Sequence, residues 1–383
     1  MAQDSDETAP AAPRLFTPGP LSTAPEVRRA MLRDWGARDR EFLDMTARVR
    51  ARLVALAGGN DDFTAVPVQG GGTCAVEAMI GTLVPPDGKI LVLQNGARGK
   101  RMVDIAERLG RAFRVMSWSE DEPIEAAAVE AALAQGRGVT HVGVVHVETS
   151  SGLANPVAKV AEAVAAAGRR CLIDAMSSFG AMALDARGMR FEAVAASADQ
   201  CLEGVPGLAF VIADVQAIKG SAGNAPSLAL DLHDQWRAFE ATGQWRFTPP
   251  THVVAALDAA LDGLAREGGV LARGARYRHN CALLRRGFAE IGFKPFLDED
   301  LQAPITLTLL APGDPRFEFA GFYDRLRRRG LVIYPGKIGQ ADSFRIGCIG
   351  ALGEDDFRTL LAAVREVLAD MGVDDLTPAV ADR

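Results

Sequence analysis

The sequence predicts an α/β protein, with a large domain built on a mostly parallel sheet flanked by helices and a smaller C-terminal α+β domain. Up to residue 213, short apolar runs alternate with amphipathic helical stretches, the pattern of parallel strands that are joined by helices. The chain has 383 residues, which is long for a single core and favours two domains.

Seven apolar runs are expected to form the large sheet. They are Thr64–Val68, Lys89–Gln94, Ala112–Ser117, His141–His146, Arg170–Asp174, Ala193–Ser197 and Ala209–Ala213. Apolar residues at helical spacing follow four of these runs and predict helices. These helices are expected at Thr73–Leu83, Gly99–Leu109, Glu125–Gln135 and Val157–Ala167.

The helical period returns at residues 249–290 and predicts one long helix that leaves the large domain. Further strands are expected near Ile305–Leu310, Leu331–Tyr334 and Ser343–Gly347. We therefore predict a large domain at 15–265 and a small domain at 266–383. Residues 1–14 are rich in Ala, Pro and acidic residues, which predicts a mobile tail. Residues 15–30 are expected to pack near the functional site.

Composition excludes several classes of function. The net charge of −7 gives no reason to expect a nucleic acid or an acidic membrane as partner. The five cysteines form no CxxC pair, which argues against a disulfide framework or a zinc site and fits a reducing cytoplasm. The histidines lack metal-ligand spacing, so no metal is expected. The sequence has no apolar stretch of about 18 residues, so no transmembrane helix is expected.

A glycine-rich turn, Gln69-Gly70-Gly71-Gly72-Thr73, lies between the first predicted strand and its helix. Glycines let backbone amides approach a phosphate, and a helix N-terminus favours negative charge. Such a turn is often only a tight connection. Its place in the first strand–helix unit favours a phosphate site.

Asp174 ends the apolar run Cys171-Leu172-Ile173. One interpretation is a cap for the next segment. The other is a carboxylate that keeps a pyridine nitrogen protonated, so that the ring can accept electrons. The surrounding motifs favour the second interpretation.

Several ordered blocks together are more specific than any of these motifs. On them the chain resembles the 2-aminoethylphosphonate:pyruvate transaminase family of fold-type I enzymes, which use pyridoxal 5′-phosphate (PLP). The blocks are Leu15–Leu21, Gln69–Ala78, Asn95–Met102, His146–Gly152, Asp174–Gly180, Ser227–Leu232, Gln244–His252, Tyr334–Lys337 and Phe344–Gly347.

The resemblance implies a fold-type I large domain that binds PLP. In it Gly71, Gly72 and Thr73 would hold the cofactor phosphate. Thr149 would lie beside the cofactor ring, near its phenolic oxygen. Asp174 would pair with the ring nitrogen.

The resemblance also implies the substrates and the assembly. The family transfers an amino group from 2-aminoethylphosphonate to pyruvate and gives phosphonoacetaldehyde and alanine. Arg345 would bind the α-carboxylate of pyruvate or alanine, a role that suits the planar guanidinium fork. Thr248 would reach the cofactor phosphate of a neighbouring subunit, so a homodimer with shared active sites is expected.

Three positions depart from the family pattern. Gln200 stands where the family has the lysine that forms a Schiff base with PLP, about two dozen residues after Asp174. An amide is neither a nucleophile nor a proton carrier. Asp199 stands in place of the usual Asn, and Arg98 in place of an aromatic residue that stacks on the ring.

These departures leave three hypotheses. The chain is a transaminase of this type, or it is a catalytically inactive homologue that binds PLP or a phosphonate ligand non-covalently. The third is a lysine-independent reaction with His146 or Asp199 as base. Among the other lysines, Lys100 and Lys337 are nearest to the site by motif, and neither has an evident claim to the Schiff base.

Overall fold

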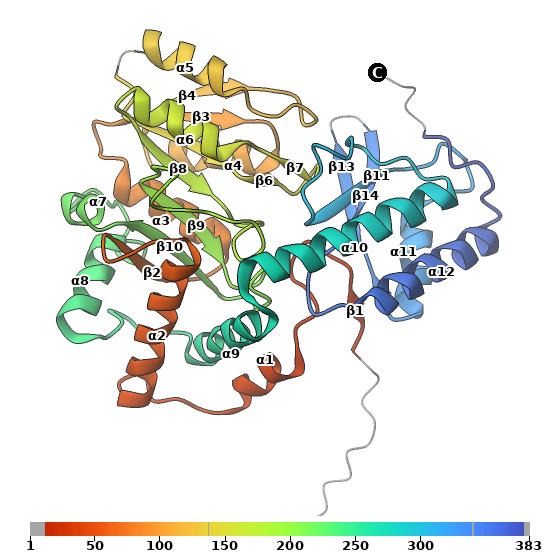
Figure 1. Cartoon of the computed structure of the whole chain (residues 1–383), viewed down its shortest axis with the longest axis horizontal. Coiled ribbons are helices and arrows are strands. Elements are labelled where there is room, and N and C mark those ends of the chain that lie inside the picture. Colours follow the sequence, from red (N-terminus) through yellow and green to blue (C-terminus); the bar gives the residue numbers. More distant parts are fainter. Residues whose placement is uncertain (1–11, 137, 339–340, 379–383) are drawn as a thin grey trace, which may run out of the picture.

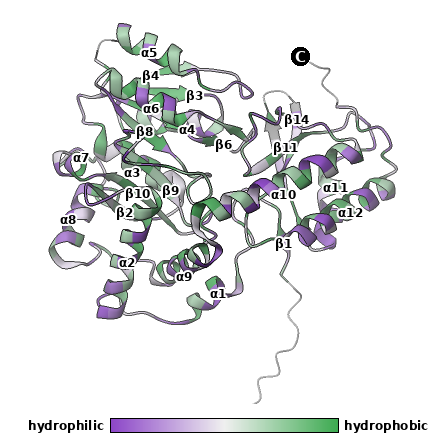
Figure 2. Cartoon of the chain, in the orientation of Figure 1, coloured by the Kyte–Doolittle hydropathy of each residue, from purple (hydrophilic) through white to green (hydrophobic). Residues whose placement is uncertain are grey.

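The computed structural model describes residues 12–136, 138–338 and 341–378. It divides into a large α/β unit and a smaller unit that are connected by a long helix, α10 (Gly269–Ile291) (Figure 1). Figure 2 shows hydrophobic residues concentrated in the strands of the large sheet, while α10 alternates between hydrophilic and hydrophobic residues along its length. Within the described residues, no helix is long and apolar enough to cross a membrane.

The large sheet has seven strands, as predicted, and is mostly parallel. Only β10 runs antiparallel to its neighbours β2 and β9. Every residue of β5 and β9 is buried, as expected for strands that helices cover on both faces. In spatial order the strands are β2 (Phe63–Gln69), β10 (Leu208–Asp214), β9 (Ala193–Ser197), β8 (Arg170–Asp174), β5 (His141–Val145), β3 (Lys89–Gln94) and β4 (Ala112–Ser117).

The four helices predicted between these strands are present. They are α3 (Gly72–Leu83), α4 (Ala97–Arg108), α5 (Ala126–Gln135) and α6 (Val157–Ala166). The structure adds helices that we did not predict, namely α1 (Pro25–Arg29), α2 (Arg40–Leu56), α7 (Val215–Gly220) and α8 (Leu232–Thr242). The buried face of α2 carries apolar residues at helical spacing, which explains why this segment is helical: Phe42, Met45, Val49 and Leu53.

The prediction of a single helix over residues 249–290 is wrong. Two helices occur there, α9 (Thr251–Glu267) and α10, and they are separated at Gly268. Gly268 and Gly269 have φ of 107° and 79°, a left-handed conformation that ends a helix and that glycine adopts without strain. Because the chain turns here, α9 packs on the large unit while α10 leads to the small one (Figure 1).

The small unit contains an antiparallel sheet in the order β11 (Thr306–Leu310), β14 (Ala341–Gly347), β13 (Tyr334–Ile338). Helices α11 (Phe319–Arg328) and α12 (Glu354–Met371) cover it around a core rich in phenylalanine. The antiparallel sheet and the helices that cover it match the α+β small domain that we predicted, and α10 leads into this unit from the large one.

The N-terminal segment is tied to the small unit. Strand β1 (Arg14–Leu15) pairs in parallel with β12 (Leu331–Val332), and the amide of Gly347 donates to Phe16 O at 2.9 Å. Arg14, which we expected to end a mobile tail, is thus part of a strand. Residues 1–11 of the expected tail lie outside the described residues.

Candidate active site

The glycine-rich turn connects β2 to the N-terminus of α3. Gly71 is the N-cap of α3, and no side chain caps the first-turn amides. The amide of Cys74 donates to Gly71 O at 2.9 Å, which leaves the amides of Gly72 and Thr73 for an anion, with the helix dipole favouring negative charge. Gly72 lies against Met176, where a Cβ would overlap the sulfur atom. This close approach holds the turn beside the segment that follows Asp174.

Asp174 is the last residue of β8, a strand at the centre of the sheet. It is buried, and its Oδ1 accepts a hydrogen bond of 2.9 Å from Met176 N. Ligands of parallel sheets bind beyond the carboxyl ends of the strands. Since Met176 contacts both Asp174 and Gly72, the structure brings together the two motifs that we predicted for the cofactor ring and its phosphate.

His146 lies next to Asp174 at this edge. Its backbone amide donates to Asp174 O at 2.8 Å, and its Nδ1 is hydrogen bonded to Ser178 Oγ at 2.8 Å. Burial lowers the pKa of His146 to about 4, so the ring is neutral at physiological pH. The ring is a packed, hydrogen-bonded part of the site wall.

Thr149 joins two arginines. It follows β6 (Val147–Glu148), and its carbonyl accepts a hydrogen bond of 3.1 Å from Arg345 Nη1. Its hydroxyl accepts one of 3.2 Å from Arg98 Nε. The Arg345 guanidinium also donates to Pro335 O and lies 4.9 Å from the ring centroid of Tyr334. Thr149, Arg98 and Arg345, which come from three separate segments of the chain, therefore meet at one place.

Glu148 is a residue of this site that we did not predict. It is fully buried, and its two oxygens accept from the backbone amides of Arg98 at 3.0 Å and Gly99 at 2.8 Å. Burial raises the pKa of Glu148, and these two amides oppose that shift. A carboxylate at the start of α4 fixes the helix end that carries Arg98. Gly96 leaves room for it, because a Cβ there would overlap the carboxyl group.

Gln200 lies in the turn after β9, at the same edge of the sheet as Asp174. The pairing of Asp174 with Ala195 places the two strands side by side, and Cys201 Sγ donates to Ser177 O at 3.1 Å across the gap. The Gln200 side chain is buried, and its Oε1 has no hydrogen-bond partner within the described chain. Gln200 thus lies beside the segment that follows Asp174, with an unsatisfied polar atom.

A network from α10 holds the turn after Gln200. Glu203, at a φ of 61°, accepts from Tyr277 Oη at 2.5 Å and from Arg276 Nη2 at 2.7 Å. Arg273 Nη1 donates to the carbonyl of Cys201 at 2.7 Å. Because all these groups are buried or half-buried, the network fixes the backbone around position 200.

These residues fit PLP as a non-covalently held group. The uncapped amides of α3 and the Thr73 hydroxyl suit a phosphate, and the buried Asp174 carboxylate suits a protonated ring nitrogen. The buried Oε1 of Gln200 lacks a hydrogen-bond partner within the described residues. They do not fit covalent attachment at position 200. Lys100 is exposed and pairs with Asp104, and the side chain of Lys337 lies outside the described part of the chain.

Thr248 is not among the residues that meet at Thr149. It is exposed and lines a cavity of about 450 Å³ with Gln69 and the strand end before it. Its expected role concerns a second subunit.

Three neighbouring groups, Asp231, His233 and Asp234, lie close enough together to hold a metal ion. However, Asp231 caps α8, and Asp234 forms hydrogen bonds or ion pairs that account for the cluster.

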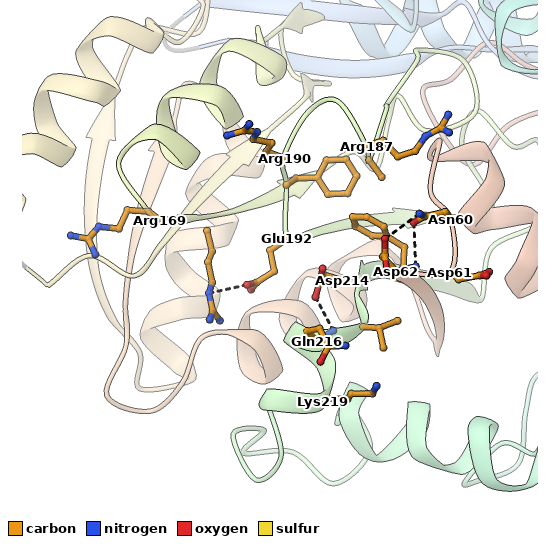
Figure 3. A pocket seen from close by; sticks show the side chains of 15 residues that line it. Asn60, Asp61, Asp62, Arg169, Arg187, Arg190, Glu192, Asp214, Gln216 and Lys219 are labelled. Atoms are coloured by element: carbon orange, nitrogen blue, oxygen red, sulfur yellow. Dashed lines mark hydrogen bonds and ion pairs between the residues drawn. The ribbon is translucent and has the colours of Figure 1, made fainter.

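A larger cavity, of about 680 Å³, lies at the opposite edge of the sheet (Figure 3). Arg170, at the first position of β8, lines it and pairs with Glu192 at 3.1 Å, whereas Asp174 ends the same strand. The cavity is therefore at the amino end of the parallel strands, away from the edge where ligands of such sheets bind. Its size alone does not make it the active site.

The sequence has close relatives. It is 51% identical over 365 residues to 2-aminoethylphosphonate–pyruvate transaminase of Pseudomonas putida (strain W619). The aligned residues make up 95% of this chain and 99% of the relative. It is 50% identical over 366 residues to the transaminase of the same name from Pseudomonas aeruginosa (strain PAO1), with 96% and 99% covered.

Solved structures share the fold. Ureidoglycine-glyoxylate aminotransferase from Bacillus subtilis superposes with a TM-score of 0.87 at 22% identity, over 97% of this chain and 98% of that one. Pyridoxamine-pyruvate aminotransferase from Mesorhizobium loti gives a TM-score of 0.86 at 24% identity, over 95% and 94%. The predicted fold-type I architecture is confirmed.

A family model described as aminotransferase class-V matches residues 29–304. Both the fold and this match imply PLP as the cofactor. The chain therefore belongs to the class V aminotransferases, within the 2-aminoethylphosphonate–pyruvate transaminase family.

Proposed function

We propose that this chain binds PLP non-covalently and transfers an amino group from 2-aminoethylphosphonate to pyruvate, giving phosphonoacetaldehyde and alanine. The observation that carries the proposal is the meeting of the α3 N-terminus with Asp174 at the strand edge where Arg345 reaches Thr149. The close relatives that bear this transaminase name support the choice of substrates.

Each residue has a task in this proposal. The amides that begin α3 and the Thr73 hydroxyl bind the cofactor phosphate. Asp174 holds a proton on the ring nitrogen, which makes the ring an electron acceptor, the chemistry that PLP supplies when it is bound. Arg345 binds the carboxylate of pyruvate, and its contacts with Pro335 and Tyr334 orient its fork before the substrate arrives.

Gln200 sets the rate. A positioned general base contributes about 10²–10⁴-fold, and an amide cannot act as one. His146 has its Nδ1 hydrogen bonded to Ser178, and Asp199 is only half-buried. Neither His146 nor Asp199 fully replaces the lysine as a base. We therefore expect slow turnover, in which water, His146 or Asp199 carries the proton that the lysine would transfer.

A second candidate function follows from the same residue. Because Gln200 has no amine and its Oε1 is unsatisfied, the chain is also suited to hold PLP or a phosphonate ligand without turnover. The retained phosphate turn, Asp174 and Arg345 would serve binding alone in this case.

We also propose a homodimer in the cytoplasm. Thr248 is exposed, and the apolar side chains of Leu228 and Phe247 are exposed on the same part of the chain, at 72% and 51%. A second subunit that covers them would bring Thr248 to its own phosphate site. The free cysteines are consistent with a reducing compartment.

We further propose that the PLP-binding domain spans residues 15–265 and the small domain residues 266–383.

The test measures alanine formation from 2-aminoethylphosphonate and pyruvate with added PLP, together with PLP affinity from absorbance titration. Asp174→Ala serves as the inactive control. Slow alanine formation that depends on PLP and on Asp174 supports transamination. Micromolar or tighter PLP binding without alanine would replace it with the second candidate, and the absence of both would reject the proposal.

A further inference from the structure

Two guanidinium groups converge on a single residue of the site. Arg98 Nε donates to the hydroxyl of Thr149 at 3.2 Å, and Arg345 Nη1 donates to its carbonyl at 3.1 Å. Thr149 is itself buried, and both arginines are half-buried. Burial lowers the pKa of Arg345, and the nearby positive charge of Arg98 acts in the same direction.

Neither guanidinium is in direct contact with a carboxylate within the described residues. No carboxylate there forms an ion pair with Arg98 or Arg345, although other arginines of the chain form ion pairs. The charge of Glu148 acts on that of Arg98 from nearby, but the Glu148 oxygens accept from backbone amides and form no ion pair with either guanidinium. Two like charges that share a half-buried site repel each other unless an anion joins them.

The donors that remain are numerous. A guanidinium has five N–H groups in a planar fork. The described contacts use one N–H of Arg98 and three of Arg345. The Glu148 contact with the Arg98 backbone fixes where the arginine leaves α4, and the shared contacts with Thr149 bring the two guanidinium groups to one residue.

We propose that Arg98 is a substrate-binding residue and that, together with Arg345, it makes this pocket selective for a doubly charged anion. The inference deepens the proposed function, because it names the class of acid that the site prefers. A single carboxylate needs one fork, whereas a phosphonate or a dicarboxylate has charge and oxygens enough for both. Arg98 stands where the family resemblance implies an aromatic residue, so this preference belongs to the present chain.

A plainer role for Arg98 is stacking over the cofactor ring in place of the aromatic residue. The two roles differ in what they bind. A stacking residue changes the affinity for PLP and leaves the affinity for small anions unchanged. A second anion-binding residue changes the affinity for dianions, whether or not PLP is present.

The test is calorimetric titration of the full chain at alkaline pH with three anions, in the presence and absence of PLP. Methylphosphonate and malonate carry two charges there, and acetate carries one. Arg98→Met removes the charge, and Arg98→Gln removes it while keeping a donor for Thr149. Arg108→Met is the matched control, since Arg108 is exposed at the other end of the same helix.

We expect the wild-type chain to bind at least one dianion about 10-fold more tightly than acetate, and both Arg98 variants to lose about that factor. Acetate affinity and the control variant should change by less than about 3-fold. The tighter dianion shows whether a phosphonate or a dicarboxylate is preferred. Equal binding of dianion and acetate, or dianion binding that survives in Arg98→Gln, would overturn the inference.

The outcome is separate from that of the proposed function. A chain that forms no alanine but binds dianions through Arg98 retains the inference and loses the transaminase proposal. A chain that forms alanine, and whose Arg98 variants bind dianions as well as the wild-type chain, retains the transaminase proposal and loses the inference. Anions that bind only at the turn before α3 are recognised because that binding does not depend on Arg98.

Discussion

Gly19 lies directly against the side-chain amide of Gln200, and a Cβ on Gly19 would overlap its nitrogen. Gly19 has a φ of 127°, a conformation that residues with a Cβ rarely adopt. The segment that carries it is held to the small unit by the pairing of Arg14 with Leu331. The N-terminal segment therefore connects the small unit to the position where the family resemblance implies a lysine.

Replacing Gly19 with alanine should destabilise the protein. The new methyl group meets the Gln200 amide, and the backbone is forced to keep an unfavourable φ, so we expect a loss of about 1–3 kcal/mol. Urea unfolding followed by circular dichroism measures the loss. Gly220→Ala is the control, because a Cβ there meets no atom within 4 Å. Equal stability of the two variants would contradict the close contact at Gly19.

Gln200→Lys should restore a covalent bond to PLP. The turn that carries position 200 is held by α10 and lies beside Asp174, so a lysine there supplies the missing amine to a prepared site. We expect PLP to survive desalting and borohydride reduction to add the cofactor mass. Alanine formation should rise by about 10²–10⁴-fold over the wild-type chain.

Gln200→Met is the matched control for this change, since it has a similar length and no amine. It should neither retain PLP after desalting nor form alanine faster than the wild-type chain. Failure of Gln200→Lys to hold PLP covalently would show that Arg98 and Asp199 have altered the pocket beyond the loss of one side chain.

Tyr277→Phe should loosen the turn after Gln200. Tyr277 Oη donates to Glu203 and accepts from Gly350 N at 3.2 Å, and the ring is fully buried. Removing the hydroxyl leaves a buried amide without its acceptor, which costs about 1–3 kcal/mol. Thermal unfolding measures this. Tyr323→Phe, on a half-buried residue of α11, should stay within about 0.5 kcal/mol, and a similar shift in both variants would argue against the network.

The sheet was predictable because its signals are local. Each buried parallel strand is a short apolar run such as Arg170–Asp174, and its bounds agree with the structure. The break at Gly268 was missed because the apolar period continues on both sides of it, although the consecutive glycines Gly268 and Gly269 are a turn signal.

The residues of the candidate site also fall into two groups, those that a local motif indicates and those that only the folded chain brings together. Asp174 and the glycine-rich turn are short motifs at the ends of strands, so the sequence could indicate them. The bond between Glu203 and Tyr277 joins residues 74 positions apart, and the contact of Gly19 with Gln200 depends on how the N-terminal segment packs. Glu148 was missed because its partners are backbone amides, which no side-chain pattern reveals.

His146 should make stability depend on pH. Burial lowers its pKa from 6.5 to about 4 in the folded protein. Between these values the unfolded chain binds a proton at this ring and the folded chain does not, so the free energy of unfolding falls as the pH is lowered through this window. The full effect is about 3 kcal/mol by the pKa difference.

His146→Asn isolates this contribution, because asparagine keeps a polar group near Ser178 and does not titrate. Urea unfolding at several pH values between about 7.5 and 4 should give a smaller loss of stability for the variant than for the wild-type chain. His279→Asn, on an exposed ring paired with Glu354, should keep most of the wild-type pH dependence. If His146→Asn retains the wild-type slope, the buried ring does not remain neutral as the pH falls, and its packing beside Asp174 does not set the acid limit of the fold.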